Sequence, residues 1–225
     1  AVTGGIGTGK TTLCRSLLAG LDDTVATALI FNPALSDIEL LKTINQEFGI
    51  RSERGRATKK RYLDALNDFL LRNFAAGRNA VLLIDEAQNL TPRAVEELRM
   101  LSNFQFGNQA LLQSFLVGQP EFREILQRPE MEQFRQRVAA TCHIGPLDAE
   151  ETRAYIEHRL KCAGATDKPS FEEGAFEGIY KASGGIPRRV NSFCDRLLLL
   201  GFLSERTHLT SEDVAEVAKE FAQEL

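Results

Sequence analysis

Two kinds of hydrophobic pattern alternate along the first two thirds of the chain. Short apolar runs predict strands buried on both faces, and they lie at 1–3, 24–31, 80–84, 111–118 and 141–144. Between these runs, apolar residues recur every three or four positions, which predicts amphipathic helices. The helices are expected from Thr12, after Ser36, over 62–74, from Pro92, over 121–126 and over 130–139. Strands that alternate with helices predict a parallel α/β sheet.

From Asp148 onward the pattern is wholly helical. Three residue pairs have the spacing of a capping box, in which two side chains satisfy free N–H groups at a helix start. These pairs are Asp148 with Glu151, Ser170 with Glu173, and Thr210 with Asp213. The change of pattern predicts a three-layer α/β domain over 1–146 and an all-α lid over 147–225. The first strand is cut short, so we expect residues to precede Ala1.

The residues after the first apolar run fit the phosphate-loop pattern G-x-x-x-x-G-K-[ST]. They read Gly4-Gly5-Ile6-Gly7-Thr8-Gly9-Lys10-Thr11-Thr12. Glycines let backbone N–H groups turn toward phosphate oxygens, Lys10 can reach the β- and γ-phosphates, and the Thr11 hydroxyl can ligate Mg²⁺. A strand before the loop and a helix after it disfavour a chance glycine-rich turn. Nucleotide phosphates and Mg²⁺ are therefore the expected ligands of this loop.

Polar residues follow two of the later apolar runs. Asp85 and Glu86 come directly after 80–84, and Gln119 comes after 111–118. Ligands of open α/β sheets bind at the carboxyl ends of the strands. Asp85 is therefore predicted to hold Mg²⁺ through its water shell, and Glu86 to polarise the attacking water. Gln119 can contact the γ-phosphate or orient water, although a glutamine in an ordinary turn remains the alternative.

Two basic features have both a functional and an ordinary explanation. Pro187 places Arg188 in the first turn of a helix, where a cation opposes the helix dipole. We expect Arg188 to meet an anion there; the alternative is a solvated arginine. The segment 50–61 is favoured as a solvated loop over a docking site for an acidic partner or nucleic acid. It contains Arg51, Arg54, Arg56, Lys59, Lys60 and Arg61, opposed by Glu53.

Composition restricts the possible functions. The net charge of −4 over 225 residues gives no overall basic field for nucleic acid. Four scattered cysteines lack metal-type spacing and are expected to be small buried side chains in a reducing compartment; they are Cys14, Cys142, Cys162 and Cys194. His143 is expected to be a strand residue, not a metal ligand. The longest apolar stretch, 197–203, is too short to span a bilayer and is expected to be a buried helix. These features favour a cytoplasmic protein.

Five segments together resemble a known family: GGIGTGKTT, LLIDEAQNL, FLVGQPEF, QFRQRV and SGGIPRRVN. Their order and spacing are those of AAA+ ATPases of the general secretion pathway protein A type, and the resemblance covers nearly the whole chain. The run EELRMLSNFQFGNQALLQSFLVGQPEFREIL is similar to the secretion ATPase found beside exosortase (PEP-CTERM) and exopolysaccharide loci. The resemblance implies a P-loop NTPase sheet of order 5-1-4-3-2, followed by a helical AAA+ lid.

The resemblance also implies roles for individual residues. Gln119 would be sensor 1, Arg188 sensor 2, and Arg137 the arginine finger, with Arg135 a poorer match. Asn32 stands where related ATPases hold the catalytic glutamate off until a partner binds. Gly5 stands where relatives often have an acidic residue, a difference that leaves the chemistry intact.

The predicted function is Mg²⁺-dependent ATP hydrolysis that drives or regulates a secretion or exopolysaccharide export and assembly system. An arginine finger acts on a neighbour's nucleotide, so a head-to-tail oligomer is expected. Further partners would be secretion or polysaccharide-assembly components at the inner membrane. A DNA-dependent ATPase of the transposition or replication-loader type is the main alternative. A small-molecule phosphotransferase and a nucleotide-gated scaffold are two others.

Overall fold

The computed structural model describes residues 1–51 and 58–221. Of the predicted basic segment, Glu53, Arg54 and Arg56 lie outside the described residues. The contacts divide the chain into two compact units. The first unit comprises Ala1–Gly4 and Lys10–Ile144, and the second comprises Gly5–Gly9 and Gly145–Leu225.

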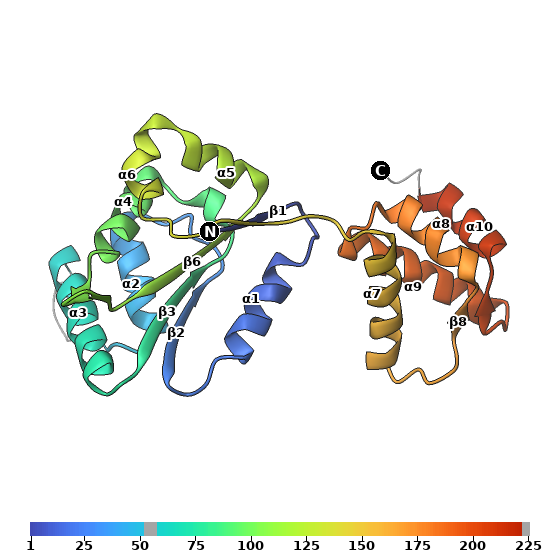
Figure 1. The fold of residues 1–225 in the computed structure, drawn as a ribbon, viewed down its shortest axis with the longest axis horizontal. Helices are drawn as coiled ribbons and strands as arrows, with labels where there is room; N and C mark the ends of the chain where they lie inside the picture. The colour runs from blue at the N-terminus through green and yellow to red at the C-terminus, as the bar shows by residue number, and fades with distance from the viewer. Residues whose placement is uncertain (52–57, 222–225) are drawn as a thin grey trace. The chain divides into compact units, whose positions relative to one another are not determined.

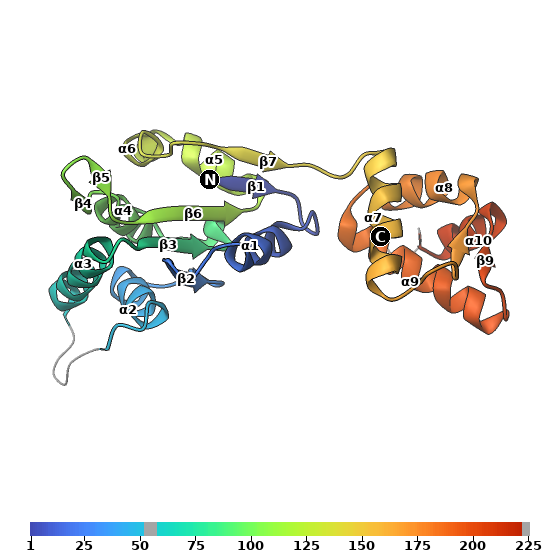
Figure 2. The same ribbon diagram turned by 60° about the horizontal axis from the view of Figure 1, so that its bottom comes forward.

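A five-stranded parallel sheet forms the centre of the first unit (Figures 1 and 2). Its strands are β1 (Val2–Gly4), β2 (Val25–Ile30), β3 (Asn79–Ile84), β6 (Gln113–Gly118) and β7 (Cys142–Ile144). They lie in the order β2-β3-β6-β1-β7, and every neighbouring pair is parallel. Counted along the chain, this is the order 5-1-4-3-2, which confirms the expected P-loop topology.

Helices cover both faces of this sheet. On one face lies α1 (Lys10–Ala19), whose Cys14 is buried with Leu83 and Val117. On the other face Leu82 and Ile84 belong to a larger core. That face carries α2 (Asp37–Glu47), α3 (Lys59–Ala75), α4 (Pro92–Leu101), α5 (Pro120–Gln127) and α6 (Glu132–Arg135). Because successive strand residues point to opposite faces, the continuous apolar run of β3 supplies both cores, and the predicted three layers are confirmed (Figure 1).

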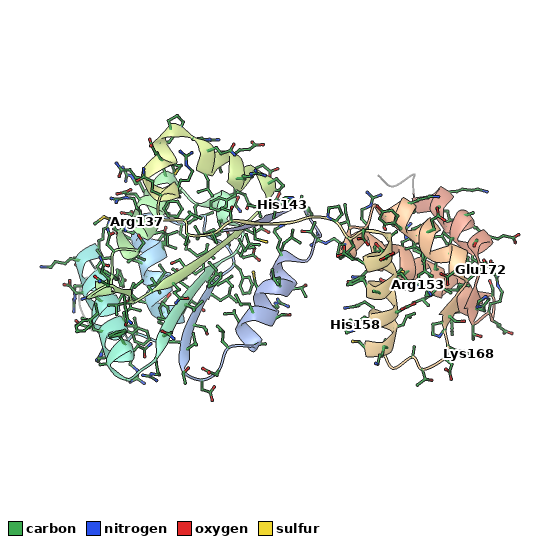
Figure 3. The ribbon with its side chains drawn as sticks, in the orientation of Figure 1. Arg137, His143, Arg153, His158, Lys168 and Glu172 are labelled. Carbon is green, nitrogen blue, oxygen red and sulfur yellow. The ribbon has the colours of Figure 1, made fainter. Side chains whose placement is uncertain are left out.

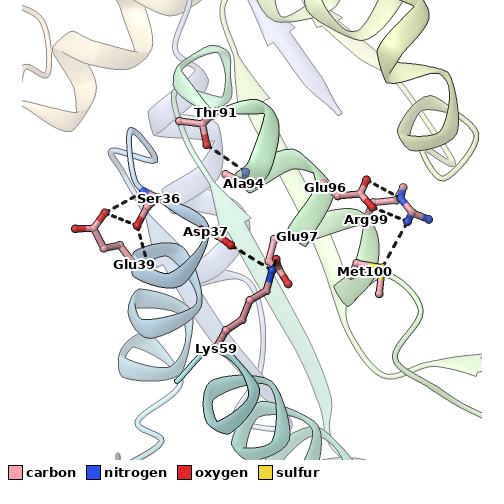
Figure 4. Close-up of polar contacts among 10 residues, drawn as sticks. All are labelled: Ser36, Asp37, Glu39, Lys59, Thr91, Ala94, Glu96, Glu97, Arg99 and Met100. Carbon is pink, nitrogen blue, oxygen red and sulfur yellow. Dashed lines mark hydrogen bonds and ion pairs between the residues drawn. The ribbon is translucent and has the colours of Figure 1, made fainter. Parts of the chain in front are cut away.

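Polar contacts join the helices that cover the face of the sheet with the larger core (Figure 4). Ser36 caps α2, as predicted, and it also forms a capping box with Glu39, which the prediction did not include. At the start of α3, the Lys59 ammonium lies 3.2 Å from Asp37 Oδ2 and also forms an ion pair with Glu97 of α4. The side chain of Glu97 is buried, and its hydrogen bond raises the pKa of Lys59 above the usual value. One cation therefore links three helices.

Two segments of the first unit differ from the prediction. The run 111–118 begins its strand only at Gln113, and residues 105–110 before it form a short hairpin of β4 (Gln105–Phe106) and β5 (Gln109–Ala110) that was not predicted. The helix predicted over 130–139 is wrong: a 3-10 turn, η2 (Pro129–Met131), precedes α6, and α6 ends at Arg135. The N–H groups of Arg137 and Val138 bond three residues back, a pattern that tightens and ends a helix. Val138 then packs on the larger core.

In its described part, up to residue 221, the second unit has four helices around its own core. They are α7 (Ala149–Cys162), α8 (Glu173–Ser183), α9 (Pro187–Leu203) and α10 (Ser211–Phe221). Ile156, Ile179, Phe193 and Val214 are among its buried residues. A pair of two-residue parallel strands, β8 (Ser170–Phe171) and β9 (His208–Leu209), is added to this helical unit. Strands this short leave no periodicity in a sequence, so the prediction did not include them.

Two of the three predicted capping boxes are present in the second unit. Asp148 and Glu151 form one at the start of α7. At α10 the N–H of Thr210 donates to Asp213 Oδ2 at 2.8 Å, and the N–H of Asp213 to Thr210 Oγ1 at 3.4 Å. The pair Ser170 with Glu173 is wrong, because Ser170 lies in β8 and α8 begins after Glu172.

Burial corrects two further predictions. The stretch 197–203 is not buried throughout: Leu197 is buried, but Phe202 is 80% exposed. Cys14 is buried, and its pKa is raised to about 11 mainly by burial, whereas Cys142 and Cys162 are exposed. Cys142 lies on the edge strand β7, where one side lacks a neighbouring strand.

The described residues contain neither a membrane-spanning helix nor a cluster of metal-binding side chains. Across 1–51 and 58–221, no helix is long and apolar enough to cross a bilayer. The same residues contain no group of three or more His, Cys, Asp or Glu side chains that could hold a metal ion.

Candidate active site

The glycine loop connects β1 to α1 through a tight backbone turn. Gly7 and Gly9 have φ angles of 81° and 95°, which residues with a Cβ rarely adopt. Both the N–H and the hydroxyl of Thr8 donate to the carbonyl of Gly5, at 3.4 and 2.9 Å. Ile6 in this loop is 63% exposed, and Thr12 in the first turn of α1 is also exposed. Alternating backbone conformations of this kind form anion-binding concavities.

Lys10 and Thr11 are the first residues of α1, and their side chains contact the end of β1 and the residue after β3. Lys10 is only 7% exposed, and its Nζ donates to the carbonyl of Gly4 at 2.8 Å. An ammonium group at this position can bind the oxygens of an anionic ligand such as a phosphate. Thr11 Oγ1 donates to Asp85 Oδ2 at 2.7 Å. Hydroxyl and carboxylate oxygens are the ligands that Mg²⁺ prefers, and these residues therefore fit a metal-bound phosphate.

The two acids after β3 have different surroundings. Asp85 is 3% exposed, and its two oxygens accept from Thr11 Oγ1 and from the N–H of Glu86, the latter at 2.9 Å. Glu86 is half-buried and has φ 53° and ψ 40°, a left-handed conformation. This conformation costs an L-residue about 1–2 kcal/mol. The partners of the two carboxylates differ: Asp85 bonds Thr11 and a backbone N–H, whereas the Glu86 side chain bonds other side chains.

The Glu86 carboxylate is held by two side-chain amides. Gln119, at the start of α5, donates from Nε2 to Glu86 Oε2 at 3.2 Å. Gln88, in the 3-10 turn η1 (Ala87–Asn89), donates to the same oxygen. The carbonyl oxygen of the Gln88 amide accepts the backbone N–H of Gln119 at 3.0 Å. The structure thus brings Glu86 and Gln119 together as predicted for a strand-end site, and it adds Gln88.

Sequence reasoning missed Gln88. The residue lies two positions after Glu86 in LLIDEAQNL, and nothing in its spacing indicates contact with the end of β6. Gly118, which precedes Gln119, is the residue that could have indicated a close contact at the end of β6. A Cβ at Gly118 would lie 3.0 Å from Gln88 Oε1 and 2.9 Å from Phe122 Cβ. A glycine at the end of a strand indicates close approach of another group.

Other predicted residues lie apart from this network. Asn32 is exposed, and its amide oxygen accepts the N–H of Ala34 at 3.4 Å. Among the described residues, the side-chain partners of Glu86 are Gln88 and Gln119, not Asn32. Arg137 is exposed in the turn after α6 (Figure 3). His143 is a strand residue as expected, with Nδ1 3.0 Å from Thr3 Oγ1.

In the second unit, Arg188 and Arg189 lie in the first turn of α9. Gly184 and Gly185 end α8 and precede Pro187, as predicted. A Cβ at Gly185 would lie 1.9 Å from the carbonyl oxygen of Leu147, so this position requires glycine. Arg189 donates to the carbonyl of Ala182 at 2.9 Å and lies over the ring of Phe221. Arg189 is therefore a packing residue of this unit.

The comparisons with known proteins agree with this geometry. Residues 1–126, more than half of the chain, match the model of the AAA domain family. The chain belongs to the AAA domain family. It is also 39% identical over 219 residues to general secretion pathway protein A of Aeromonas hydrophila. That match covers 97% of this chain and 40% of the relative, so the chain spans less than half the relative's length.

Solved structures with the same fold have lower sequence identity. Cdc6p from Pyrobaculum aerophilum is 19% identical with a TM-score of 0.74, over 98% of this chain and 60% of that one. The RuvB Holliday junction branch migration motor of Thermotoga maritima is 18% identical with a TM-score of 0.64, over 97% and 60%. These likenesses support the fold of a P-loop ATPase with a helical lid. The predicted resemblance to the general secretion pathway protein A type is confirmed, and the chain is an ATPase domain.

Proposed function

We propose that this AAA domain hydrolyses ATP in a Mg²⁺-dependent reaction at the ends of β1, β3 and β6. The observation that carries the proposal is the hydrogen-bonded series from Thr11 through Asp85 and Glu86 to Gln119. It combines ligands for a hard cation with a carboxylate that can receive a proton. The phosphate-loop lysine lies at the start of the same helix as Thr11.

Each residue has a distinct part in the proposed reaction. The backbone N–H groups from Gly4 to Thr12 and the Lys10 ammonium bind the phosphates, and Thr11 and Asp85 hold Mg²⁺. When bound, Mg²⁺ would neutralise charge on the β- and γ-phosphate oxygens. The Glu86 carboxylate takes a proton from a water molecule while the oxygen of that water bonds to the γ-phosphorus. The bond from that phosphorus to the bridging oxygen breaks, which yields ADP and phosphate, and Gln119 orients the water or the γ-phosphate.

We further propose that hydrolysis in the whole protein drives or regulates secretion, or exopolysaccharide export and assembly, at the inner face of the membrane. Support comes from the 39% identity to a protein named for general secretion. A DNA-dependent ATPase is the second candidate, because one structural neighbour is named as an Aeropyrum pernix ORC1 protein in complex with DNA. The net charge of −4 disfavours that alternative. Turnover with and without duplex DNA or membrane vesicles separates the two.

The Glu86→Gln variant tests the proposed chemistry. We expect unchanged ATP affinity and a loss of about 10²-fold or more in turnover, the scale of a general base. Phosphate release measures turnover, and calorimetric titration measures affinity. Glu96→Gln is the matched control, because Glu96 lies on the exposed side of α4 and pairs with Arg99. Near-normal turnover of Glu86→Gln would remove Glu86 from the reaction.

A further inference from the structure

We propose that Gln88 is a positioning residue that fixes the Glu86 carboxylate against the end of β6. This inference rests on the proposed role of Glu86 in hydrolysis. Gln88 contacts both the side chain of Glu86 and the backbone of Gln119, which follow β3 and β6 respectively. It therefore ties together the two strand ends that supply the base and the sensor.

The contacts leave the Gln88 amide one orientation. A glutamine amide has an accepting end and a donating end. The backbone N–H of Gln119 can only donate, so the Gln88 carbonyl oxygen must face it. The Gln88 NH₂ group then faces the Glu86 carboxylate. A flipped amide would place donor against donor and acceptor against acceptor, which would lose both hydrogen bonds.

Both amides donate to the same oxygen of Glu86. Gln88 and Gln119 each bond Oε2, and among the described residues Oε1 has no hydrogen-bond partner. One oxygen is thus held in place, and the other keeps its lone pairs for a water molecule. Misplacement of a reacting group by about 1 Å can cost on the order of 10²-fold in rate. Gln88 therefore sets the geometry of the reaction without touching the nucleotide.

The surrounding backbone accommodates this bridge. Glu86 is held in the left-handed conformation that presents its side chain to Gln88. Gly118 leaves the space that the Gln88 amide occupies, because a Cβ there would lie 3.0 Å from Gln88 Oε1. Strained residues persist only where neighbouring groups hold them. Here the holding groups are the two amides on the carboxylate and Asp85 on the Glu86 N–H.

Two variants of Gln88 distinguish the effects of its two hydrogen bonds, one to the Glu86 carboxylate and one to the Gln119 N–H. Gln88→Leu removes the donor and the acceptor, whereas Gln88→Glu keeps an acceptor for the Gln119 N–H but removes the donor to Glu86. We expect kcat for ATP to fall about tenfold to a hundredfold in both variants, with unchanged ATP affinity. Asn89→Leu is the matched control at the exposed neighbouring position and should keep normal kcat.

Hydrogen exchange at the Gln119 amide gives a readout that does not depend on turnover. The exchange should be faster in Gln88→Leu and remain slow in Gln88→Glu. In a Glu86→Gln background, Gln88→Leu should cause no further loss of kcat, because residues that act as a unit are not additive. A Gln88→Leu protein with slow Gln119 exchange would show that the bridge does not exist.

The kinetic measurements can overturn the proposal as well. Normal kcat in Gln88→Leu, with Glu86→Gln inactive, would remove Gln88 while leaving the proposed function intact. A merely structural role of Gln88 would be indicated if the loss of kcat in Gln88→Leu added fully to the loss in Glu86→Gln. It would also be indicated if Gln88→Leu weakened ATP affinity and lowered the unfolding temperature to the same extent as it lowered kcat. Full activity of Glu86→Gln would overturn both ideas, because no base would remain to be positioned.

Discussion

Two polar clusters in the first unit use carboxylates in opposite ways. In the strand-end cluster (Thr11, Asp85, Glu86, Gln88 and Gln119), the acids accept hydrogen bonds from hydroxyl, amide and backbone groups that carry no charge. In the Lys59 cluster (Asp37, Lys59 and Glu97), one ammonium group lies between two carboxylates (Figure 4). Among the described residues, no arginine pairs with Asp85 or Glu86.

The different partners of these carboxylates suit the Lys59 cluster to stabilising the fold and the strand-end cluster to catalysis. A buried carboxylate matched by a cation inside the chain has its charge balanced before any ligand arrives, so its role is to hold helices together. Carboxylates held by neutral donors keep their charge available for a metal ion or a proton. The strained backbone of Glu86 lies in the second kind of cluster, where strain serves to orient a reacting group. Four variants test this contrast.

The largest effect is expected at Arg137, which we propose supplies a cation to the strand-end cluster of a neighbouring subunit. Arg137→Ala should lower turnover by about 10³-fold, near the lower end for arginine fingers, with little change in ATP binding. Mixing it with Lys10→Ala, which has a finger but no working phosphate site, should restore part of the activity. Arg135→Ala is the control and should remain active.

The finger assignment has a clear counter-result. If the mixture remains as inactive as its components while wild type assembles, Arg137 does not act on a neighbour. Full activity of Arg137→Ala alone would show that the cluster needs no outside cation.

Lys59→Met should cause the largest loss of stability. Removing the cation leaves the buried Glu97 carboxylate without its partner, which costs on the order of 3 kcal/mol. Urea unfolding measures the loss, and the affinity for ATP should not change. Arg99→Met is the control: Arg99 pairs with the exposed Glu96 on the same helix (Figure 4), and such pairs contribute about 0–1 kcal/mol.

A second variant distinguishes lost pairing from lost packing at this cluster. Lys59→Met combined with Glu97→Leu removes both charges and should recover much of the stability. If the double variant is less stable than Lys59→Met alone, the cluster stabilises the fold by packing and not by charge balance.

In the second unit, we expect different effects from the neighbouring residues Arg188 and Arg189. As sensor 2 it would contact the nucleotide, so Arg188→Ala should reduce the ratio of ATP to ADP affinity severalfold, to be measured by competitive titration. Arg189→Ala should leave that ratio unchanged but lower the unfolding temperature, because Arg189 bonds the carbonyl of Ala182. Equal changes in the affinity ratio for both variants would contradict the assignment of Arg188.

The smallest effect is a dependence of stability on pH at Asp37. The hydrogen bond to Lys59 is the largest cause that lowers the pKa of the Asp37 carboxyl below its ordinary 3.8. Ionised Asp37 therefore adds to the free energy of unfolding above about pH 3.8. This stabilisation is lost as the pH falls through the lower pKa that Asp37 has in the folded protein. Asp37→Asn should destabilise the protein at neutral pH and progressively less in acid. A constant difference across that range would show that ionised Asp37 adds nothing.

Local spacing alone determined much of this protein. The glycine loop, the continuous apolar strands, the Ser36 cap and the start of α9 at Pro187 are all recognised from residues within a few positions of one another. Each depends on backbone conformation or on hydrogen bonds within one turn, which short patterns encode directly. The sheet order followed from the family resemblance, and Asp85, Glu86 and Gln119 could be assigned to strand ends because the apolar runs stop there.

Only the tertiary structure decided which distant groups meet. Gln88 and Gln119 are 31 positions apart, and Lys59 joins helices on both sides of it in the sequence. Ser170 looked like a helix cap, but its hydroxyl lies 3.0 Å from His208 Nδ1, 38 positions away. The helix predicted over 130–139 ends at Arg135, and Val138 beyond that end packs on the core. Local helix preferences amount to at most about 1 kcal/mol per residue, and no local sequence pattern records which distant groups come into contact.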